Sequence, residues 1–381
     1  MIWYVIATLS PAAVVALACL LGGAWAWAAL AAMTVLVAAL DRFTRVSLPP
    51  RAESGAALAM AVAGVHFMLL FLGVRALSGA VPLGPWQSVA LAAALGSFFG
   101  QVSNTDAHEL IHARGRWRVR LGTAVFVSLL FGHHVSAHLR VHHPHVGTAR
   151  DPNSARLGES FYRFWPRAWI GSFRAGWQAE AQLRQRGGGG RLHPYAIYVG
   201  GALATLAAAA LIGGIRGVAA LLVLAAWAQT QLLLADYVQH YGLRRPLRRD
   251  GSPLPVSVQE SWNAAPWFSG AMMLNAPRHS DHHLHPARAF PGLRLDAPDL
   301  PMLPLAMPAM GLLAAFPWLW RRVMDPRVAA LTRGDVNLLQ TKSGAKSPIL
   351  ADSGHGESGI DSDRPRGDAG LSAIDAERGG V

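Results

Sequence analysis

The stretch AALAMAVAGVHFMLLFLGV, residues 56–74, decides the fold class of this chain. It contains no Asp, Glu, Lys or Arg, and His66 is its one histidine. Its length is close to the ~20 residues that an α-helix needs to cross ~30 Å of hydrocarbon at ~1.5 Å per residue. The stretch therefore predicts a helix that spans a membrane.

Comparable stretches lie on both sides of it, and the composition agrees. The chain is 52% apolar and 15% charged, whereas soluble domains carry about 25% charged residues. The first stretch lacks the charged start of a signal peptide, and only Gly22 and Gly23 separate it from the second, so the two predict a helical hairpin. We expect an all-α integral membrane protein with six transmembrane helices, at about 3–21, 24–40, 56–74, 86–104, 195–213 and 217–236.

Arginines mark one side of the expected bundle. They are frequent after the second, fourth and sixth predicted spans, whereas the loop after the third has none beyond Arg75 and the hairpin after the fifth has only Arg216. Short loops rich in Lys and Arg stay in the cytoplasm. The pattern therefore places both termini, and the segments 105–194 and 237–333, on the cytoplasmic side of a bacterial-type inner membrane. The net charge of +12 has the same explanation, so we expect a lipid bilayer and no nucleic acid as a partner.

The chain divides into a membrane-embedded domain and a tail. Residues 1–333 are expected to form the domain, and residues 334–381, rich in Ser, Gly and charged side chains, a disordered tail. Apolar runs at 121–132 and 302–320 are too short or too rich in proline for spans, so they predict core or interfacial helices. Cys19 is the single cysteine, which excludes an internal disulfide and cysteine-ligated zinc or iron–sulfur sites.

Three histidine clusters follow the predicted spans. They read HELIH at 108–112, HLRVHH at 138–143 and HSDHH at 279–283. Histidines three or four residues apart share one face of a helix, so their rings can reach one point. Imidazole is a ligand for iron, zinc, copper and nickel, and burying many rings without a partner would be costly. The clusters therefore predict a metal site.

The number of histidines favours more than one metal ion. A tetrahedral zinc site uses at most four protein ligands, the three clusters hold eight histidines, and His240 at the end of the sixth predicted span offers a ninth. We list the candidate ligands as His108, His112, His138, His142, His143, His240, His279, His282 and His283. Of the other histidines, His66 is expected to pack between helices and His193 and His355 to lie in loops, and the neighbours of the clusters to be incidental or to support the ligands: His133, His134, His145 and His285.

Two other functions could use some of these residues. HELIH is also the signature of zinc proteases, with Glu109 as general base, but a protease needs only one further ligand and leaves the other clusters unexplained. A metal transporter would hold its ligands near the middle of the bilayer, whereas these histidines lie at or beyond the ends of the predicted spans. Both remain less favoured alternatives.

The sequence resembles the membrane-bound alkane 1-monooxygenases, which are related to xylene monooxygenase and the membrane fatty acid desaturases. The resemblance runs to about Arg327 and excludes the tail. Five segments carry it: NTDAHELIH at 104–112, HLRVHHPHVGTARDPNSARLGES at 138–160, DYVQHYGL at 236–243, PRHSDHHLHP at 277–286 and WLWRRVMDPRV at 318–328. It implies six spans and two non-haem irons held by the nine histidines. This chain departs from the family pattern at Ala137, where many members have Glu, and at Asp236 and Gln239, where Asn and Glu are usual.

The resemblance also implies an activity. It is the O2-dependent hydroxylation of the terminal methyl group of medium-chain alkanes to 1-alkanols; a related hydroxylase or desaturase of methyl-aromatic or fatty-acyl substrates is the alternative. Glu109 and Asp281 are candidates for orienting the ligand rings.

Electrons would have to come from outside the chain, because it has no dinucleotide fingerprint and too few cysteines for an iron–sulfur centre. The resemblance implies a rubredoxin or ferredoxin with an NAD(P)H-dependent reductase. Two groups of arginines could form a basic surface for such a carrier, Arg114, Arg116, Arg118 and Arg120, and Arg244, Arg245, Arg248 and Arg249.

Overall fold

The computed structural model describes residues 1–44, 46, 48–52, 54–187 and 192–333, so the predicted tail at 334–381 lies outside the described residues. Within them the chain is helical, and the β-pairing consists of two isolated bridges, Leu247 with Pro253 and Asn263 with Met302. The all-α prediction is confirmed for this part of the chain.

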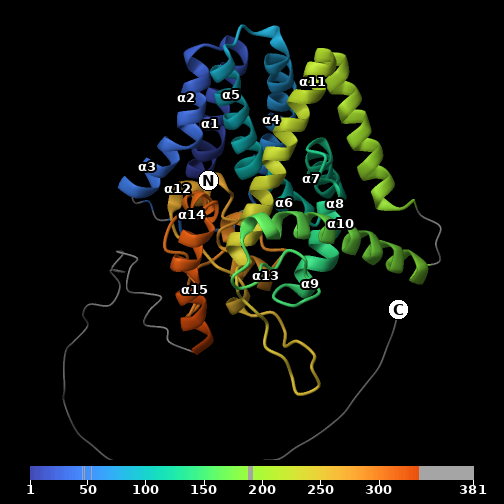
Figure 1. Ribbon diagram of the computed structural model, residues 1–381, viewed down its shortest axis with the longest axis vertical. Helices are drawn as coiled ribbons and strands as arrows, with labels where there is room; N and C mark the ends of the chain where they lie inside the picture. The colour runs from blue at the N-terminus through green and yellow to red at the C-terminus, as the bar shows by residue number, and fades with distance from the viewer. Residues whose placement is uncertain (45, 47, 53, 188–191, 334–381) are drawn as a thin grey trace, which may run out of the picture. The chain divides into compact units, whose positions relative to one another are not determined.

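Four helices of the described part are long and apolar enough to cross a membrane. They are α1 (Ile2–Leu21), α2 (Ala24–Met33) continued by α3 (Val35–Phe43), α4 (Ala56–Arg75) continued by the π-helical η1 (Ala76–Ala80), and α11 (Pro194–His240). Gly22 and Gly23, with φ of 62° and 57°, reverse the chain between α1 and α2, a backbone conformation that glycine adopts without steric cost. The two helices pack side by side after this turn, as the hairpin prediction requires (Figure 1).

The long helix α11 contains two of the predicted spans. Its backbone leaves the helical conformation at Gly213 and at Gly214, where φ is 59° and ψ is −144°. Figure 1 shows the result as two legs of α11 that meet at the top of the view. A side chain at Gly213 would collide with Ser78, so the bend also requires a residue without Cβ. The fifth and sixth predicted segments thus form the two legs of one bent element.

The fourth predicted span, 86–104, is the apolar part of a longer helical run. It lies in α5 (Pro85–Phe98) and the π-helical η2 (Phe99–Ser103), and α6 (Asn104–Ile111) continues directly from it. This run carries the first histidine cluster out of the apolar bundle. The structure therefore shows four long apolar helices, and the total of six spans remains a prediction.

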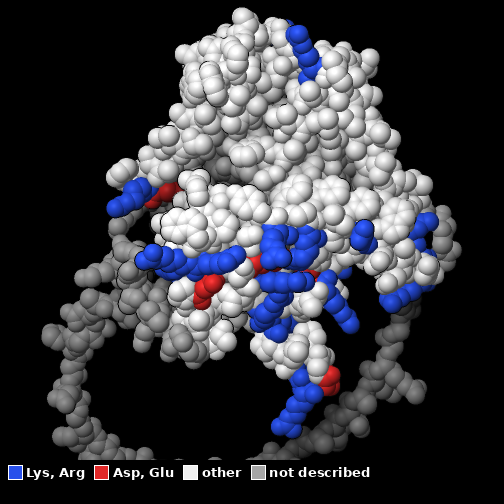
Figure 2. Space-filling model, in the orientation of Figure 1, with Lys and Arg blue, Asp and Glu red and all other residues white. Residues whose placement is uncertain are grey.

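Charge separates the described molecule into two parts. Figure 2 shows Lys and Arg gathered over the lower part, while the upper part, formed by α1, α2, α4, α5 and α11, is almost free of charge. Apolar side chains near the bend of α11 are exposed in the upper part, with Leu211 at 89% and Ile215 at 81%. Exposed apolar side chains of this density fit a hydrocarbon surrounding.

Short helices form the lower part around the ends of the long ones. The predicted core or interfacial helices at 121–132 and 302–320 correspond to α7 (Arg116–Ser128), and to α14 (Met307–Ala314) with the start of α15 (Pro317–Arg333). The elements are α7 (Arg116–Ser128), α8 (His133–Ala137), η3 (His138–His142), α9 (His143–His145), α10 (Phe161–Arg186), η4 (Val258–Glu260), α12 (Trp267–Met272), α13 (His279–Leu284), η5 (Phe290–Gly292), α14 (Met307–Ala314) and α15 (Pro317–Arg333).

The topology can be tested with reporter fusions. A fusion at Gly79 or at Arg216 should report an extracytoplasmic position, because Gly79 lies near the end of the apolar helix Ala56–Ala80 and Arg216 lies just after the bend of α11. A fusion after Leu243 should report the cytoplasm. The reverse pattern would refute the assigned orientation, and equal signals at Arg216 and Leu243 would refute the spanning of the second leg of α11.

Candidate metal centre

The first histidine cluster lies on and just after α6, which continues directly from the apolar helices α5 and η2. His108 lies on α6, and His112 follows the last residue of that helix. The spacing of four residues puts both rings on one face, and their centroids are 5.0 Å apart. Both rings lie beyond the apolar part of the run, where the structure surrounds them with the other two clusters.

A π-helical turn shapes the second cluster. In η3 the N–H of His143 donates to the carbonyl of His138, five residues earlier, instead of the usual four. His138 and His143 therefore share a face, and their Nε2 atoms are 2.9 Å apart. His142 points away from them, into a different group. The sequence spacing predicted that His138 and His142 would reach one point, and the π turn separates them.

The third cluster is an ordinary helical turn. His279 and His283 lie four residues apart on α13, and their Nε2 atoms approach to 3.1 Å. His282 points to the other side, where its Nε2 lies 3.2 Å from that of His143. The helix thus supplies rings to both sides of the centre.

The nine predicted ligands assemble into two groups. In each group one nitrogen atom of every ring lies within 4.8 Å of all the others. The five-histidine group is His108, His112, His138, His143 and His282. The four-histidine group is His142, His240, His279 and His283. Each of the three clusters contributes to the five-histidine group, and the four-histidine group draws on the second and third clusters and on the end of α11.

The distances within the groups fit metal ligands. Nε2 of His112 lies 3.0 Å from Nε2 of His138 and 3.1 Å from that of His143. Burial first, and the neighbouring histidines second, hold the pKa of these three rings well below the usual value. A neutral ring has one N–H, so three mutually close nitrogens cannot all be paired by hydrogen bonds. One metal ion bound by the Nε2 lone pairs of His112, His138 and His143 would satisfy all three.

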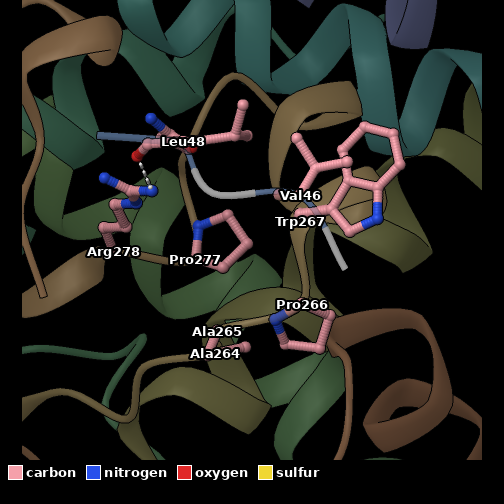
Figure 3. Close-up of a pocket in the computed structure, with 10 residues that line it drawn as sticks. Val46, Leu48, Ala264, Ala265, Pro266, Trp267, Pro277 and Arg278 are labelled. Atoms are coloured by element: carbon pink, nitrogen blue, oxygen red, sulfur yellow. Dashed lines mark hydrogen bonds between the residues drawn. The ribbon is translucent and has the colours of Figure 1, made fainter. Parts of the chain in front are cut away.

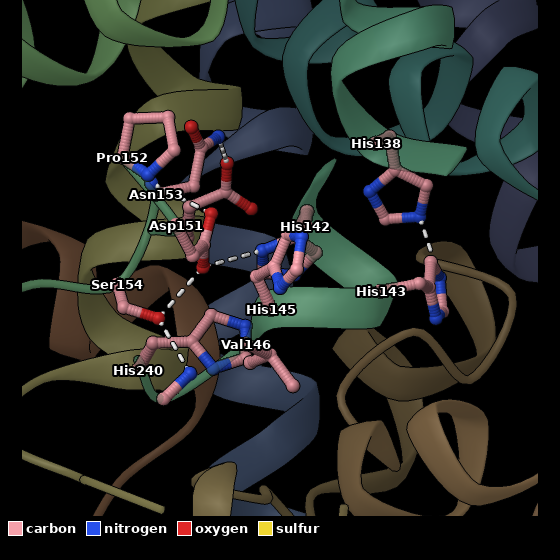
Figure 4. Close-up of polar contacts among 12 residues, drawn as sticks. His138, His142, His143, His145, Val146, Asp151, Pro152, Asn153, Ser154 and His240 are labelled. Carbon is pink, nitrogen blue, oxygen red and sulfur yellow. Dashed lines mark hydrogen bonds and ion pairs between the residues drawn. The ribbon is translucent and has the colours of Figure 1, made fainter. Parts of the chain in front are cut away.

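Two rings of the four-histidine group have fixed outer partners. Nδ1 of His142 lies 2.9 Å from a carboxylate oxygen of Asp151 (Figure 4), and Nδ1 of His240 lies 2.9 Å from the backbone oxygen of Glu260. An Nδ1–H that donates to such a partner leaves Nε2 as the free ligand atom. Burial alone would raise the pKa of the Asp151 carboxyl, but its contacts with His142 and Ser154 lower the pKa to about 2. Sequence reasoning missed Asp151, because no spacing rule connects it to a ring.

The two acidic residues singled out in the sequence have other contacts. Asp281 accepts hydrogen bonds from Arg288, from His285 and from the backbone N–H of Arg294. Burial raises the pKa of Glu109 to about 7, while the backbone of Phe290 and the charge of Arg118 act in the opposite direction. These contacts lie among residues outside the two histidine groups.

The segment that carries the third cluster is fastened by Arg278. Its guanidinium donates to the backbone oxygen of Leu48 at 2.8 Å (Figure 3) and also to that of Leu293. Arg278 is bonded to His279, so the tie fixes the start of α13 against two other stretches of chain. These hydrogen bonds hold the start of α13, and with it the rings that this helix carries.

An apolar cavity of about 500 Å³ reaches both histidine groups. It runs between α2, α3, α5, α11 and α14, and its walls include His108 and His138 of the five-histidine group and His279 of the four-histidine group. Most of its lining is apolar, such as Val37, Leu234 and Met307. Asp236, Gln239 and His134 add polar groups. A cavity of this kind suits an apolar molecule with one end beside the rings.

Four of the remaining histidines have hydrogen-bond partners nearby. His66 packs between helices as predicted, with Nε2 2.8 Å from Ser128 Oγ. His193 accepts from the N–H of Tyr195 at the start of α11. His133 lies against Ser172, and His285 against Asp281. His355 lies outside the described residues.

Comparison with known proteins places these features in a family. The family model described as fatty acid desaturase matches residues 84–319. The alkane 1-monooxygenase of Pseudomonas putida is 35% identical over 70% of this chain and 66% of its own length. The alkane 1-monooxygenase 1 of Alcanivorax borkumensis is 34% identical over 74% of this chain and 70% of its own. The xylene/toluene monooxygenase hydroxylase component XylM of Pseudomonas putida is 26% identical over 78% of this chain and 81% of its own length. The matched regions thus span about two thirds of the first two relatives.

The metal groups predict which histidines are needed to hold ions. His282→Ala removes a ring whose nitrogen faces the five-histidine group, so elemental analysis of the purified variant should find less metal than in the unchanged protein, by about one ion per chain. His285→Ala is the matched control, because this ring belongs to the same stretch, is half exposed and contacts Asp281. Equal metal contents in the two variants would contradict the assignment.

Proposed function

The chain belongs to the fatty acid desaturase family and to its alkane 1-monooxygenases, and we propose that it uses O2 to hydroxylate the terminal methyl group of medium-chain alkanes at a non-haem di-iron centre. The observation that carries the proposal is one apolar cavity that ends on rings of both histidine groups. A substrate without polar groups could lie in this cavity with one end beside both metal positions.

The nine histidines are the proposed iron ligands, five for one ion and four for the other. When bound, the irons would supply the activation of O2 and the cleavage of the C–H bond. The chain itself supplies a fixed arrangement of neutral nitrogen ligands, held from behind by Asp151 and by the backbone of Glu260. Buried rings on the four-histidine side keep water away from that position.

The cavity supports substrate entry from the bilayer. Its lining includes Thr34 and Ala38 of the second predicted span, and both residues are exposed on the surface of the structure. A hydrocarbon dissolved in the membrane could therefore enter between the long helices without crossing water. Such a route favours alkanes over charged molecules, because transfer of a charge into this lining would be costly. Similarity to XylM keeps methyl-aromatic substrates as the second candidate class.

We propose that the electrons come from an external carrier protein, a rubredoxin or a ferredoxin, which is reduced by its own reductase. Exposed arginines of the basic part could attract an acidic partner and raise its rate of association. Arg245, which the sequence analysis included in this surface, has a different role. It is 8% exposed and donates to the backbone oxygens of Val146 and Pro144. The proposed docking surface therefore uses the exposed Arg244, Arg248 and Arg249 of this group. The other predicted group also stays in the proposal, with Arg114, Arg116 and Arg120 exposed and Arg118 partly exposed.

Product analysis tests the reaction. Purified protein with iron, O2 and a reducing carrier should convert medium-chain alkanes to 1-alkanols, and a panel of methyl-aromatic and fatty-acyl substrates should react more slowly. Thr230→Phe narrows the cavity about 15 Å along α11 from His240, at ~1.5 Å per residue. The variant should shift the preference toward shorter alkanes by about tenfold or more, since overpacking costs ~1–3 kcal/mol.

Thr230→Val is the control for this variant, because it removes the hydroxyl without adding bulk. It should keep the original chain-length preference, and both variants should keep their iron. Oxidation of the aromatic panel in preference to alkanes would replace the proposed substrate class. An unchanged preference in Thr230→Phe would remove the cavity as the substrate site.

Salt dependence tests the docking surface. Turnover at limiting carrier should fall as ionic strength rises from about 0.01 to 0.15 M, where the Debye length shrinks from ~30 to ~8 Å. Arg248→Gln with Arg249→Gln should raise the carrier concentration needed for half-maximal rate, with iron content unchanged. Arg216→Gln, at the bend of α11, should not. Equal carrier requirements in the two variants would leave these arginines with a role in topology alone.

A further inference from the structure

The two histidine groups differ in what surrounds them. All four rings of the four-histidine group are buried, whereas His108, His112 and His143 of the five-histidine group are partly exposed. Among the described residues, the carboxylate that contacts a ring of either group is that of Asp151, on His142. The two metal positions therefore have the same kind of ligand and a different electrostatic surrounding.

Hydrogen bonds hold the carboxylate of Asp151 in one position. Its side chain is buried, its Oδ2 accepts from Ser154 Oγ at 2.6 Å, and its Oδ1 accepts from the backbone N–H of Asn153 at 3.0 Å. The remaining contact of Oδ2 is Nδ1 of His142 at 2.9 Å. Figure 4 shows the carboxylate between these groups. A carboxylate held in this way fixes the orientation of the His142 ring and directs its Nε2 toward the four-histidine group.

The loop around Asp151 is fastened to the chain that follows α11. Gly147 N–H donates to Ser154 Oγ at 2.8 Å, and the backbone N–H of Arg245 donates to the carbonyl of Gly147 at 2.9 Å. The buried guanidinium of Arg245 holds Val146 in the same loop. The same stretch of chain thus ends α11 at His240 and anchors the loop that supports His142.

A second carboxyl group, that of Asp236, is linked to Asp151 through Asn153. Asn153 donates from its side chain to Asp236 at 2.6 Å, while its backbone N–H donates to Asp151. Asp236 is buried on α11, one turn before His240. Negative charge near a buried cation site stabilises the cation, because the surrounding dielectric is low. Asp151 contacts His142, and Asp236 shares α11 with His240, and both of these histidines belong to the four-histidine group.

We propose that Asp151 is a positioning residue that makes the four-histidine group the tighter of the two metal positions. It acts through the His142 ring and does not contact the ion itself. The inference rests on the proposed function only in requiring two metal positions in one chain. It predicts that the two ions differ in affinity, and that the difference depends on one carboxylate of a loop that carries no ligand.

Competition with a chelator tests the proposal. The protein is loaded with iron(II) without O2, exposed to increasing chelator, and the ions left per chain are counted. The unchanged protein should release one ion before the other. In Asp151→Asn, which keeps an acceptor for Nδ1–H and loses the charge, the tighter ion should leave at about ten- to a hundredfold less chelator, the range known for outer partners of metal ligands. Asp151→Glu should restore most of the difference.

Glu159→Gln is the matched control. Glu159 is a carboxylate of the same loop that pairs with Arg167 at 2.8 Å, so its loss loosens the loop and leaves the His142 contact in place. Its two release steps should match those of the unchanged protein. The proposal fails if Asp151→Asn leaves the tighter step unchanged, shifts both steps equally, or behaves like Glu159→Gln. Fewer than two ions in the unchanged protein would overturn the proposed di-iron function as well, and this result is distinct from the others.

Discussion

Mutual contact of uncharged imidazole nitrogens is the constraint on which the structure depends. His112, His138 and His143 place their Nε2 atoms about 3 Å from one another in a buried setting. Such lone pairs repel each other unless a shared cation lies between them, and desolvation prevents the rings from gaining protons instead. The short helices of the lower part bring rings from distant parts of the sequence to this point. Their arrangement is therefore explained by the demands of the centre more than by their own apolar faces.

The long helices form the walls of the apolar cavity that reaches the two histidine groups. Backbone polar groups in hydrocarbon must be satisfied within a helix, and so the connections between the long helices at their upper ends are short, at Gly22–Gly23 and Val81–Gly84, while the longer irregular stretches that the structure describes lie in the lower part. The run from α5 through α6 links the two parts and carries His108 to the end of the cavity. A reaction on an apolar substrate needs both parts in contact, and this run supplies the connection.

The sequence was sufficient for the elements that obey a simple period. Uncharged stretches predicted the long helices, and the sequence singled out all nine histidines that the structure gathers into two groups, eight from their clustering and His240 from its place at the end of the sixth predicted span. The division of the nine was not predictable, because the π turn at His138–His142 changes the spacing that puts two rings on one face. Asp151 was equally hidden, since its contact with His142 depends on a loop fastened by Arg245. The prediction of six spans rests on the length and apolar composition of the stretches, and the described part of the chain has four helices that meet these criteria.

The π turn of η3 also bears on how these motifs should be aligned with each other. The second cluster has one residue more between its first histidine and its adjacent pair than the third cluster has, HLRVHH against HSDHH. In both, the first histidine and the last share a group, and the middle one crosses to the other group. The wider turn absorbs the additional residue, so two strings of different length present three rings in the same way. A one-residue gap between such motifs marks a difference in helical winding, with the coordination pattern retained.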